Sequence, residues 1–232
     1  MTEMLELMKR RRSLRAPYDP GRPVEPEKLA QILEAARWSP TAHNMQNFEI
    51  VVVDDPAVLD AIARLERPVS ETFVRENHAQ LSFSEEELVQ RKTGILGTMF
   101  PPSWRKPDFK LDELSADEIA AMRRPLLSSP LLLVVVYDPS RRAPASEGDF
   151  LGIVSLGCVM ENMWLAAESM GVGLHIVSSL SSGGEVKELL GIPARLTIAF
   201  SCRLGYPVSA PPPYLRVRRE VADFTHRNKY RD

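Results

Sequence analysis

Two patterns of hydrophobic residues alternate along the chain, one with the spacing of a helix and one of continuous apolar runs. Apolar residues spaced three and four apart, typical of amphipathic helices, recur in the segment that Pro26 opens and Pro40 stops. Continuous runs rich in β-branched residues are typical of buried strands. The predicted helices are residues 4–8, 26–39, 56–65, 149–170 and 185–190, and the predicted strands are residues 48–53, 131–137, 174–177 and 196–202. This alternation predicts an α/β or α+β arrangement of three layers around one sheet.

The longest predicted helix, residues 149–170, is expected to be central. Its small residues Ser155, Gly157 and Cys158 permit close packing, either inside one subunit or between two. Gly171 follows its end, since glycine tolerates the left-handed conformation of a helix C-cap. The continuous apolar character of residues 48–53 predicts a strand that is buried on both faces.

Residues 66–125 do not follow a steady period. They contain an acidic cluster at 85–87 and a proline-rich stretch at 100–107, and a helix is predicted to resume at Ser115. Long excursions of this kind are usually lids, binding loops or disordered segments. No internal repeat or Gly/Ser linker divides the chain, so residues 1–232 are predicted to form one domain with 66–125 as an excursion or lid.

Composition and charge exclude several classes of protein. The 232 residues are 44% hydrophobic and 26% charged, and the formal net charge of −2 gives no general attraction to nucleic acid or anionic lipid. Cys158 and Cys202 lie far apart and form no metal-binding spacing. The longest apolar run, residues 131–137, is too short to span a bilayer, and the N-terminus has the reverse of the charge order of a secretory signal. We therefore expect a cytoplasmic protein that binds no membrane, metal or nucleic acid.

A polar loop between a helix and a strand is the most distinctive stretch of the chain. Residues 38–53 read WSPTAHNMQNFEIVVV, so short polar side chains follow a helix end and precede a strand. Such a loop offers backbone N–H groups to a flat ligand at the edge of the sheet. We expect His43 in this loop to satisfy backbone groups and not to act directly in catalysis.

Basic residues cluster near both ends of the chain. The run Arg11-Arg12-Ser13-Leu14-Arg15 follows the first helix, and Arg216, Arg218 and Arg219 lie near the C-terminus. Arginine offers planar, bidentate donors that suit a phosphate, although such runs are also common on solvated helix ends and tails. One phosphate has room for several guanidinium groups, so a single anionic ligand would explain both elements.

Small residues follow the third predicted strand. Residues 178–184 let a backbone approach a flat ring with N–H groups free to donate, or they form an ordinary turn. The preceding Gly171-Val172-Gly173 ends a helix where a dinucleotide-binding fingerprint would open one, and the chain has no P-loop. No histidine adjoins a nucleophile elbow, which disfavours a hydrolase.

These loops and basic ends together resemble the nitroreductase family of FMN enzymes. In that family a segment reading roughly SPSxxNxQPW lines one side of the flavin, and Asn47-Phe48 stands here where Pro-Trp is usual. Basic elements near both ends of the family's chains contact the FMN ribityl chain and phosphate. The resemblance runs from about residue 9 to residue 228, with 66–125 outside it in detail.

The resemblance implies a set of cofactor-binding residues on four segments. They are Arg11, Arg12, Ser13, Arg15, Pro40, Thr41, Ala42, Asn44, Gln46, Val177, Ser178, Ser179, Arg216 and Arg218. Ser178 and Ser179 are implied as donors near flavin N5 and O4, and no side chain is implied as a certain catalytic group.

The resemblance also implies a fold and a reaction. The fold is α+β, with a central, mostly antiparallel sheet flanked by helices in three layers, and the protein is a homodimer with FMN at the subunit interface. NAD(P)H passes hydride to flavin N5, and an electron-poor acceptor such as a nitroaromatic or quinone then takes it. Two alternatives stay open. One is a specialised branch of the family (dehydrogenase, reductive dehalogenase or flavin-fragmenting enzyme) marked by the 66–125 excursion. The other is a non-enzymatic nucleic-acid binder that uses the basic N-terminal arm and the Trp104 region.

Overall fold

The structure, a computed structural model, describes residues 2–65, 85–91, 129–177, 180, 184–210 and 216–230. The chain divides into two compact units, residues 1–67 with 123–211, and residues 68–122 with 212–232. The sheet and its helices belong to the first unit. A single domain stays a prediction, and the predicted helix at Ser115 lies outside the described residues.

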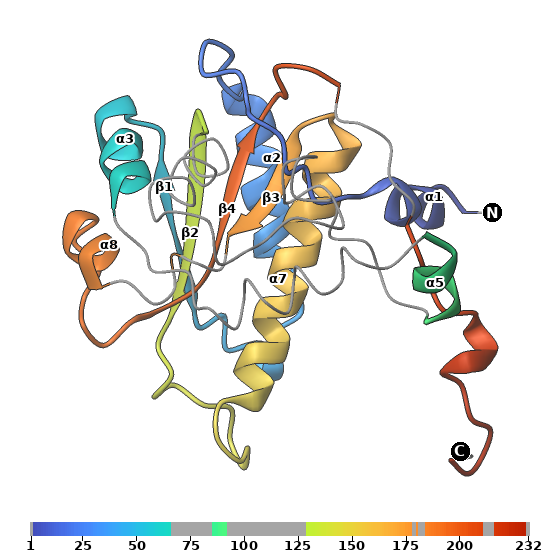
Figure 1. The fold of residues 1–232 in the computed structure, drawn as a ribbon. Coiled ribbons are helices and arrows are strands. Elements are labelled where there is room, and N and C mark those ends of the chain that lie inside the picture. Colours follow the sequence, from blue (N-terminus) through green and yellow to red (C-terminus); the bar gives the residue numbers. More distant parts are fainter. Residues whose placement is uncertain are drawn as a thin grey trace, which may run out of the picture. The chain divides into compact units, whose positions relative to one another are not determined.

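A four-stranded antiparallel sheet forms the centre of the first unit (Figure 1). Its order is β1 (Phe48–Val53), β2 (Leu131–Tyr137), β4 (Thr197–Gly205) and β3 (Gly173–Val177). All three strand pairs are antiparallel, and the β2–β4 register shifts between Val135 and Val136. The predicted α+β class with an antiparallel sheet is thereby confirmed.

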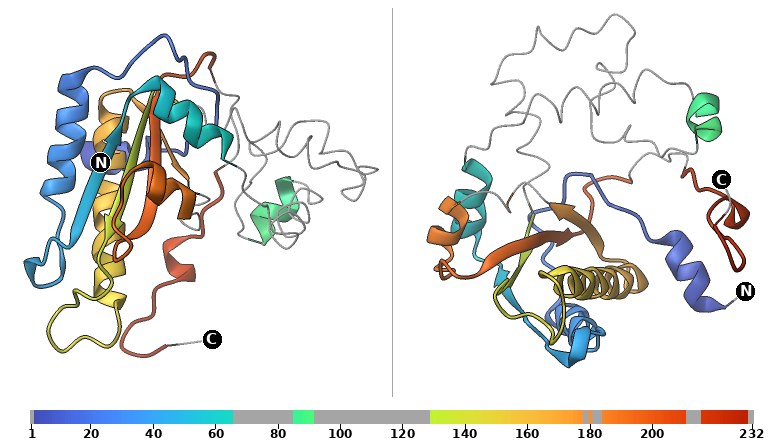
Figure 2. Two further views of the ribbon diagram at one scale, coloured as in Figure 1. Left: turned by 90° about the vertical axis from the view of Figure 1, so that its left-hand side faces the viewer. Right: turned by 90° about the horizontal axis from the view of Figure 1, so that it is seen from below.

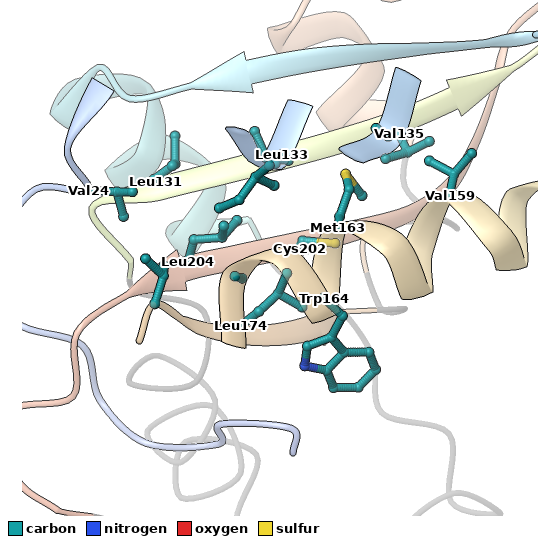
Figure 3. Packing of buried hydrophobic residues seen from close by; sticks show 14 of the residues in the cluster. Val24, Leu131, Leu133, Val135, Val159, Met163, Trp164, Leu174, Cys202 and Leu204 are labelled. Atoms are coloured by element: carbon teal, nitrogen blue, oxygen red, sulfur yellow. The ribbon is translucent and has the colours of Figure 1, made fainter. Parts of the chain in front are cut away.

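Helices cover both faces of this sheet (Figure 2). One face packs against α2 (Pro26–Arg37) and α7 (Phe150–Ser169), and the other against α3 (Pro56–Arg64) and α8 (Gly184–Leu189). Successive residues of β2 point to opposite faces, so alternate side chains join the two cores. The core under α2 and α7 contains Leu131, Leu133, Val135, Val159, Met163 and Cys202 (Figure 3), and the other contains Leu132, Val134, Val136, Ile62 and Val186.

Strand β1 differs from its prediction in burial. It forms over the predicted residues 48–53 but lies at the edge of the sheet, where Val53 is buried and Val52 is 37% exposed. Strand β2 has the same continuous apolar pattern and is buried along six residues. The prediction that β1 is buried on both faces is therefore wrong. The sequence of a strand does not determine whether the strand lies at the edge or in the middle of the sheet.

Helix α7 is the longest helix that the structure describes. Val159, Met163 and Ala167 are fully buried against the sheet, whereas Phe150, Ile153 and Val154 near its start are 49–67% exposed. By length and composition alone α7 is apolar enough to cross a membrane, and it alone passes that test among the described helices. This is weak support for a span, since the core helix of a soluble protein passes the same test.

Helix α1 (Glu3–Arg10) is amphipathic and lies against α7. Thr2 caps its first turn, and none of its residues is buried. Its apolar side chains Met4, Leu5 and Met8 are 41–54% exposed. In the second unit the structure describes helix α5 (Glu85–Gln90) and the 3-10 turn η4 (Val221–Asp223), which Glu220 and Asp223 cap reciprocally.

Candidate functional site

The polar loop after α2 has a strained backbone. It continues from Pro40 into the 3-10 turn η1 (Ala42–Asn44), and the φ angles of His43, Asn44 and Gln46 are 51°, 53° and 45°. Residues other than glycine seldom adopt positive φ, although asparagine tolerates it best. Such strain persists only where the surrounding contacts determine the conformation, and it collects at binding and catalytic sites.

Hydrogen bonds inside the loop join three of the predicted site residues. The Thr41 hydroxyl accepts a hydrogen bond from the Gln46 N–H at 3.1 Å, and the Thr41 carbonyl accepts one from the Asn44 N–H at 2.9 Å. The Gln46 amide donates to the Asn44 side-chain oxygen at 3.1 Å. Asn44 and Gln46 remain exposed, so they are accessible to a ligand.

Two polar side chains of helix α7 hold the loop in place. The Ala42 N–H donates to the Ser155 hydroxyl at 2.9 Å, and that hydroxyl donates to the Leu151 carbonyl at 2.7 Å. Two helical turns further along α7, the Asn162 amide donates to the Ser39 hydroxyl at 2.9 Å. The sequence suggested Ser155 only as a small packing residue and did not suggest Asn162. Their seven-residue spacing, which places two polar side chains on one face of an apolar helix, was the available signal.

Asn47 replaces the proline that is usual in the resembling segment, and it has a structural role. Its side chain is 7% exposed and its amide donates to the Arg141 carbonyl at 3.3 Å. The contact ties the start of β1 to the loop between β2 and α7. This departure therefore falls on a buried residue and leaves the exposed Asn44 and Gln46 unaffected.

The basic segment after α1 lies along β3 and α7. The Leu14 N–H donates to the Leu174 carbonyl at 3.0 Å, and the Trp164 indole donates to the Arg12 carbonyl at 3.2 Å. Arg11 pairs with Glu161 of α7 at 3.3 Å, and its guanidinium lies 4.4 Å from the centre of the Trp164 ring. Arg12, Ser13 and Arg15 are partly exposed.

One helix thus holds two of the predicted site segments. Ser155 and Asn162 hold the polar loop, while Glu161 and Trp164 hold the basic segment. At 1.5 Å per residue the contacts between Ser155 and Trp164 are spread over only about 14 Å of helix. The structure therefore brings the N-terminal basic residues and the polar loop to the same support.

The other two predicted segments are placed less completely. Val177 ends β3, and its side chain is 6% exposed in the core under α3 and α8, which leaves only its backbone to face a ligand. Ser178 and Ser179 lie outside the described residues. Arg216 and Arg218 belong to the second unit, where the Arg218 guanidinium donates to the Val217 carbonyl at 2.8 Å. Their convergence with the N-terminal arginines stays a prediction.

A buried polar cluster of Tyr18, His175 and Arg203 was not predicted. Arg203 is fully buried, and its Nε donates to His175 Nδ1 at 3.1 Å. Burial, and then the charge of Arg203, lowers the pKa of His175 to about 3, so the imidazole is neutral. Burial also lowers the pKa of Arg203 to about 10 and raises the pKa of Tyr18 far above its usual range.

Other chemistries find little support in the described part of the chain. No group of three or more His, Cys, Asp or Glu side chains there is arranged to hold a metal ion. Cys202 is buried, and burial raises the pKa of its thiol well above the usual range, which disfavours a nucleophilic thiolate. His43 is exposed at the surface of the polar loop.

Residues 8–206 match the model of the nitroreductase family. This match covers most of the sequence, and the chain belongs to the nitroreductase family. An NADPH-flavin oxidoreductase of Vibrio harveyi is 34% identical over 96 residues, which is 41% of this chain and 39% of that protein. An NADPH-dependent oxidoreductase of Staphylococcus epidermidis is 24% identical over 226 residues, 97% of this chain and 73% of that protein.

Solved structures show the same fold at lower sequence identity. A nitroreductase with bound FMN from Bacteroides fragilis superposes with a TM-score of 0.61 at 18% identity, over 97% of this chain and 99% of that one. A nitroreductase with bound FMN from Desulfitobacterium hafniense has a TM-score of 0.59 at 21% identity, over 97% of this chain and 98% of that one. The predicted family and its fold are confirmed.

Proposed function

We propose that this protein is an FMN-dependent oxidoreductase that takes hydride from NAD(P)H and passes it to an electron-poor acceptor such as a nitroaromatic or a quinone. The observation that carries the proposal is the attachment of two predicted cofactor segments to one helix, α7, in a chain of the nitroreductase family. The FMN bound in two relatives of the same fold supports it.

The residues present fit such a cofactor. Arg12, Ser13 and Arg15 offer partly exposed donors for its phosphate, with Arg11, Arg216 and Arg218 as further cations. Ala42, Asn44 and Gln46 belong to a loop whose conformation is fixed in advance, which lowers the entropic cost of binding a planar ring. A bound FMN would supply a hydride-accepting N5 that can pass the hydride from NAD(P)H on to the acceptor.

The chain's own task is to bind and orient. Hydride transfer needs no side-chain base, so we assign no catalytic acid or base. Ser178 and Ser179, directly after β3, are proposed as donors near N5 and O4. Cations beside the pyrimidine end would stabilise the anionic reduced ring by electrostatic attraction.

We propose further that the protein is a cytoplasmic homodimer. Large apolar side chains are exposed on α1, including Met4 and Met8, and also at the start of α7, including Phe150 and Ile153. Monomeric proteins rarely expose many large apolar groups on neighbouring elements, whereas a symmetric interface covers the same patch on both subunits. Cys158 and Cys202 are both free, in keeping with a reducing compartment.

Purified protein tests the function directly. We expect bound FMN, anaerobic bleaching of its visible absorption by NADH or NADPH, and recovery when a quinone or nitroaromatic is added. Flavin that bleaches with dithionite but with neither nucleotide would indicate a specialised branch of the family. Colourless protein that does not bind added FMN would refute the proposal, and salt-sensitive binding of DNA by such protein would favour the nucleic-acid alternative.

A further inference from the structure

Arg203 connects the sheet to the basic segment near the N-terminus. Arg203 lies on β4 and its side chain is fully buried. Its Nη2 donates a hydrogen bond to the Ala16 carbonyl at 2.6 Å. Its Nε donates to His175 of the neighbouring strand β3, with which it is paired in register. Its guanidinium also lies 4.5 Å from the centre of the Tyr18 ring.

Burying a charged guanidinium costs free energy of desolvation, so its hydrogen bonds must offset that cost. A charge taken out of water is tolerated where hydrogen bonds satisfy its donors. Here a neutral imidazole and a backbone carbonyl accept from two different nitrogens of one rigid, planar group. Two such bonds fix the Ala16 carbonyl relative to β3 and β4, because the guanidinium cannot flex between them.

The contact falls in the middle of residues 12–18, a segment we call the strap. The strap is bonded to the rest of the first unit at Arg12, Leu14 and Ala16, each through the backbone. The Tyr18 hydroxyl also donates back to the Leu14 carbonyl at 3.1 Å. With the backbone fixed at alternate positions, the partly exposed side chains of Ser13 and Arg15 are held at defined places between them.

The absence of a side chain at Gly173 allows Leu14 of the strap to pack directly against β3. A Cβ at Gly173 would come 2.1 Å from Leu14 Cδ2 and 2.9 Å from the Gly205 carbonyl oxygen. The strap and the two strands therefore pack without room for a further methyl group. A segment packed this tightly suits precise placement of donors.

We propose that Arg203 is a positioning residue, which fixes the strap so that Arg12, Ser13 and Arg15 meet the phosphate of FMN. The inference rests on the proposed function and adds a residue to it. A purely structural role for Arg203 would weaken every flavin equally, whereas positioning of phosphate ligands weakens only a flavin that carries phosphate.

The test compares FMN with riboflavin, which has the same ring system and no phosphate. Dissociation constants of both are measured with apoprotein by quenching of flavin fluorescence, for the natural protein and for Arg203→Met. We expect FMN binding to weaken on the order of 10-fold, the scale of lost hydrogen bonds to a charged group. Riboflavin binding should change by less than about twofold. Arg203→Lys should fall between the two proteins, because an ammonium keeps the charge but not the fork of donors.

The matched control is Arg64→Met, which removes an exposed arginine of α3 that pairs with Asp60 at 2.6 Å, and it should leave both constants unchanged. If Arg203→Met does not fold, Tyr18→Phe deletes one strap hydrogen bond and keeps the ring, and it should give a smaller loss confined to FMN. Equal loss of FMN and riboflavin, or no loss, would overturn the positioning role. Natural protein that binds neither flavin would instead refute the proposed function.

Discussion

The Ser155 hydroxyl accepts a hydrogen bond from the Ala42 N–H at 2.9 Å, across 113 residues of sequence. The same hydroxyl donates to the Leu151 carbonyl, so it connects the backbone of α7 to the strained loop before β1. This one side chain links the long apolar helix α7 to the polar loop before β1.

Ser155→Ala should loosen that loop. The change leaves the Ala42 N–H without its acceptor and should lower the free energy of unfolding by about 1–3 kcal/mol. We also expect FMN to dissociate faster, since the loop loses its preset conformation. Urea unfolding and stopped-flow release of FMN measure the two effects. Ser169→Ala is the matched control, because its hydroxyl donates to the Ala166 carbonyl within the same helix. Equal effects of both changes would contradict the anchoring role.

Arg218→Ala should weaken retention of FMN by about 1.5–3 kcal/mol, the scale of a charged hydrogen bond. Arg11→Ala should do so to a similar degree, although Arg11 also pairs with Glu161. Equilibrium titration of apoprotein with FMN measures both. Arg219→Ala is the neighbouring control, since that guanidinium lies 5.5 Å from the centre of the Phe224 ring. Unchanged affinity in both of the first two variants would remove the arginines from the phosphate site.

The free energy of unfolding should decrease in acid, in part because Glu25 becomes protonated. The hydrogen bond from the Tyr206 hydroxyl, above other causes, lowers the pKa of Glu25 to about 2. A lowered pKa stabilises the folded state above the ordinary pKa of a glutamate, and this contribution disappears as pH falls from about 4.5 toward 2. Unfolding midpoints in urea, measured across this window, should decline less steeply for Glu25→Gln. Glu27→Gln, on the exposed first turn of α2, should follow the natural protein. A Glu25→Gln curve parallel to that of the natural protein would be inconsistent with this linkage.

Gly173→Ala should destabilise the first unit by about 1–3 kcal/mol, the usual cost of overpacking. The added methyl would collide with the Leu14 side chain and with the Gly205 carbonyl, so Leu14 and the β3–β4 backbone have to shift. Thermal unfolding measures the loss. Gly184→Ala provides the comparison, because a Cβ there would meet no atom within 4 Å. A Gly173→Ala protein as stable as the natural one would show that the strap is not tightly packed.

Ile153→Glu should disrupt self-association. Ile153 is 52% exposed on α7, and a carboxylate buried there in a subunit interface would lose its hydration without gaining a partner. Light scattering after size exclusion should show a dimer for the natural protein and a monomer for the variant. Val208→Glu alters an exposed apolar residue, 66% exposed, that belongs to neither α1 nor α7, and this variant should stay dimeric. A natural protein that is monomeric at micromolar concentration would refute the dimer.

Local patterns in the sequence were sufficient for the strands and for the polar loop. A continuous apolar run determines β2 and β1 alike, because backbone propensity and side-chain pattern act over a few residues. Burial of β1 was mispredicted since the order of strands depends on residues far away in the chain. Thr41, Asn44 and Gln46 were implied by the resemblance to the flavin-lining segment of the family, and the structure joins them by hydrogen bonds.

Long-range partners explain what was missed. Arg203 sits between apolar residues of β4, and its contacts Ala16 and His175 come from two other parts of the chain. No periodicity within β4 identifies a buried arginine or its acceptors. Asn162 is a similar case, since only the fold places Ser39 against it.

The strap has a consequence for the order in which the chain acquires its structure. Leu174 and Arg203, to which it is attached, lie in the paired strands β3 and β4, so we expect the strap to dock after these strands have paired. The strap's partners lie far along the sequence, 152 residues away for Trp164 with Arg12 and 187 residues away for Arg203 with Ala16. A chain that lacks β4 has no Arg203 to bind the Ala16 carbonyl, so Arg12 and Arg15 of such a chain are held by fewer contacts.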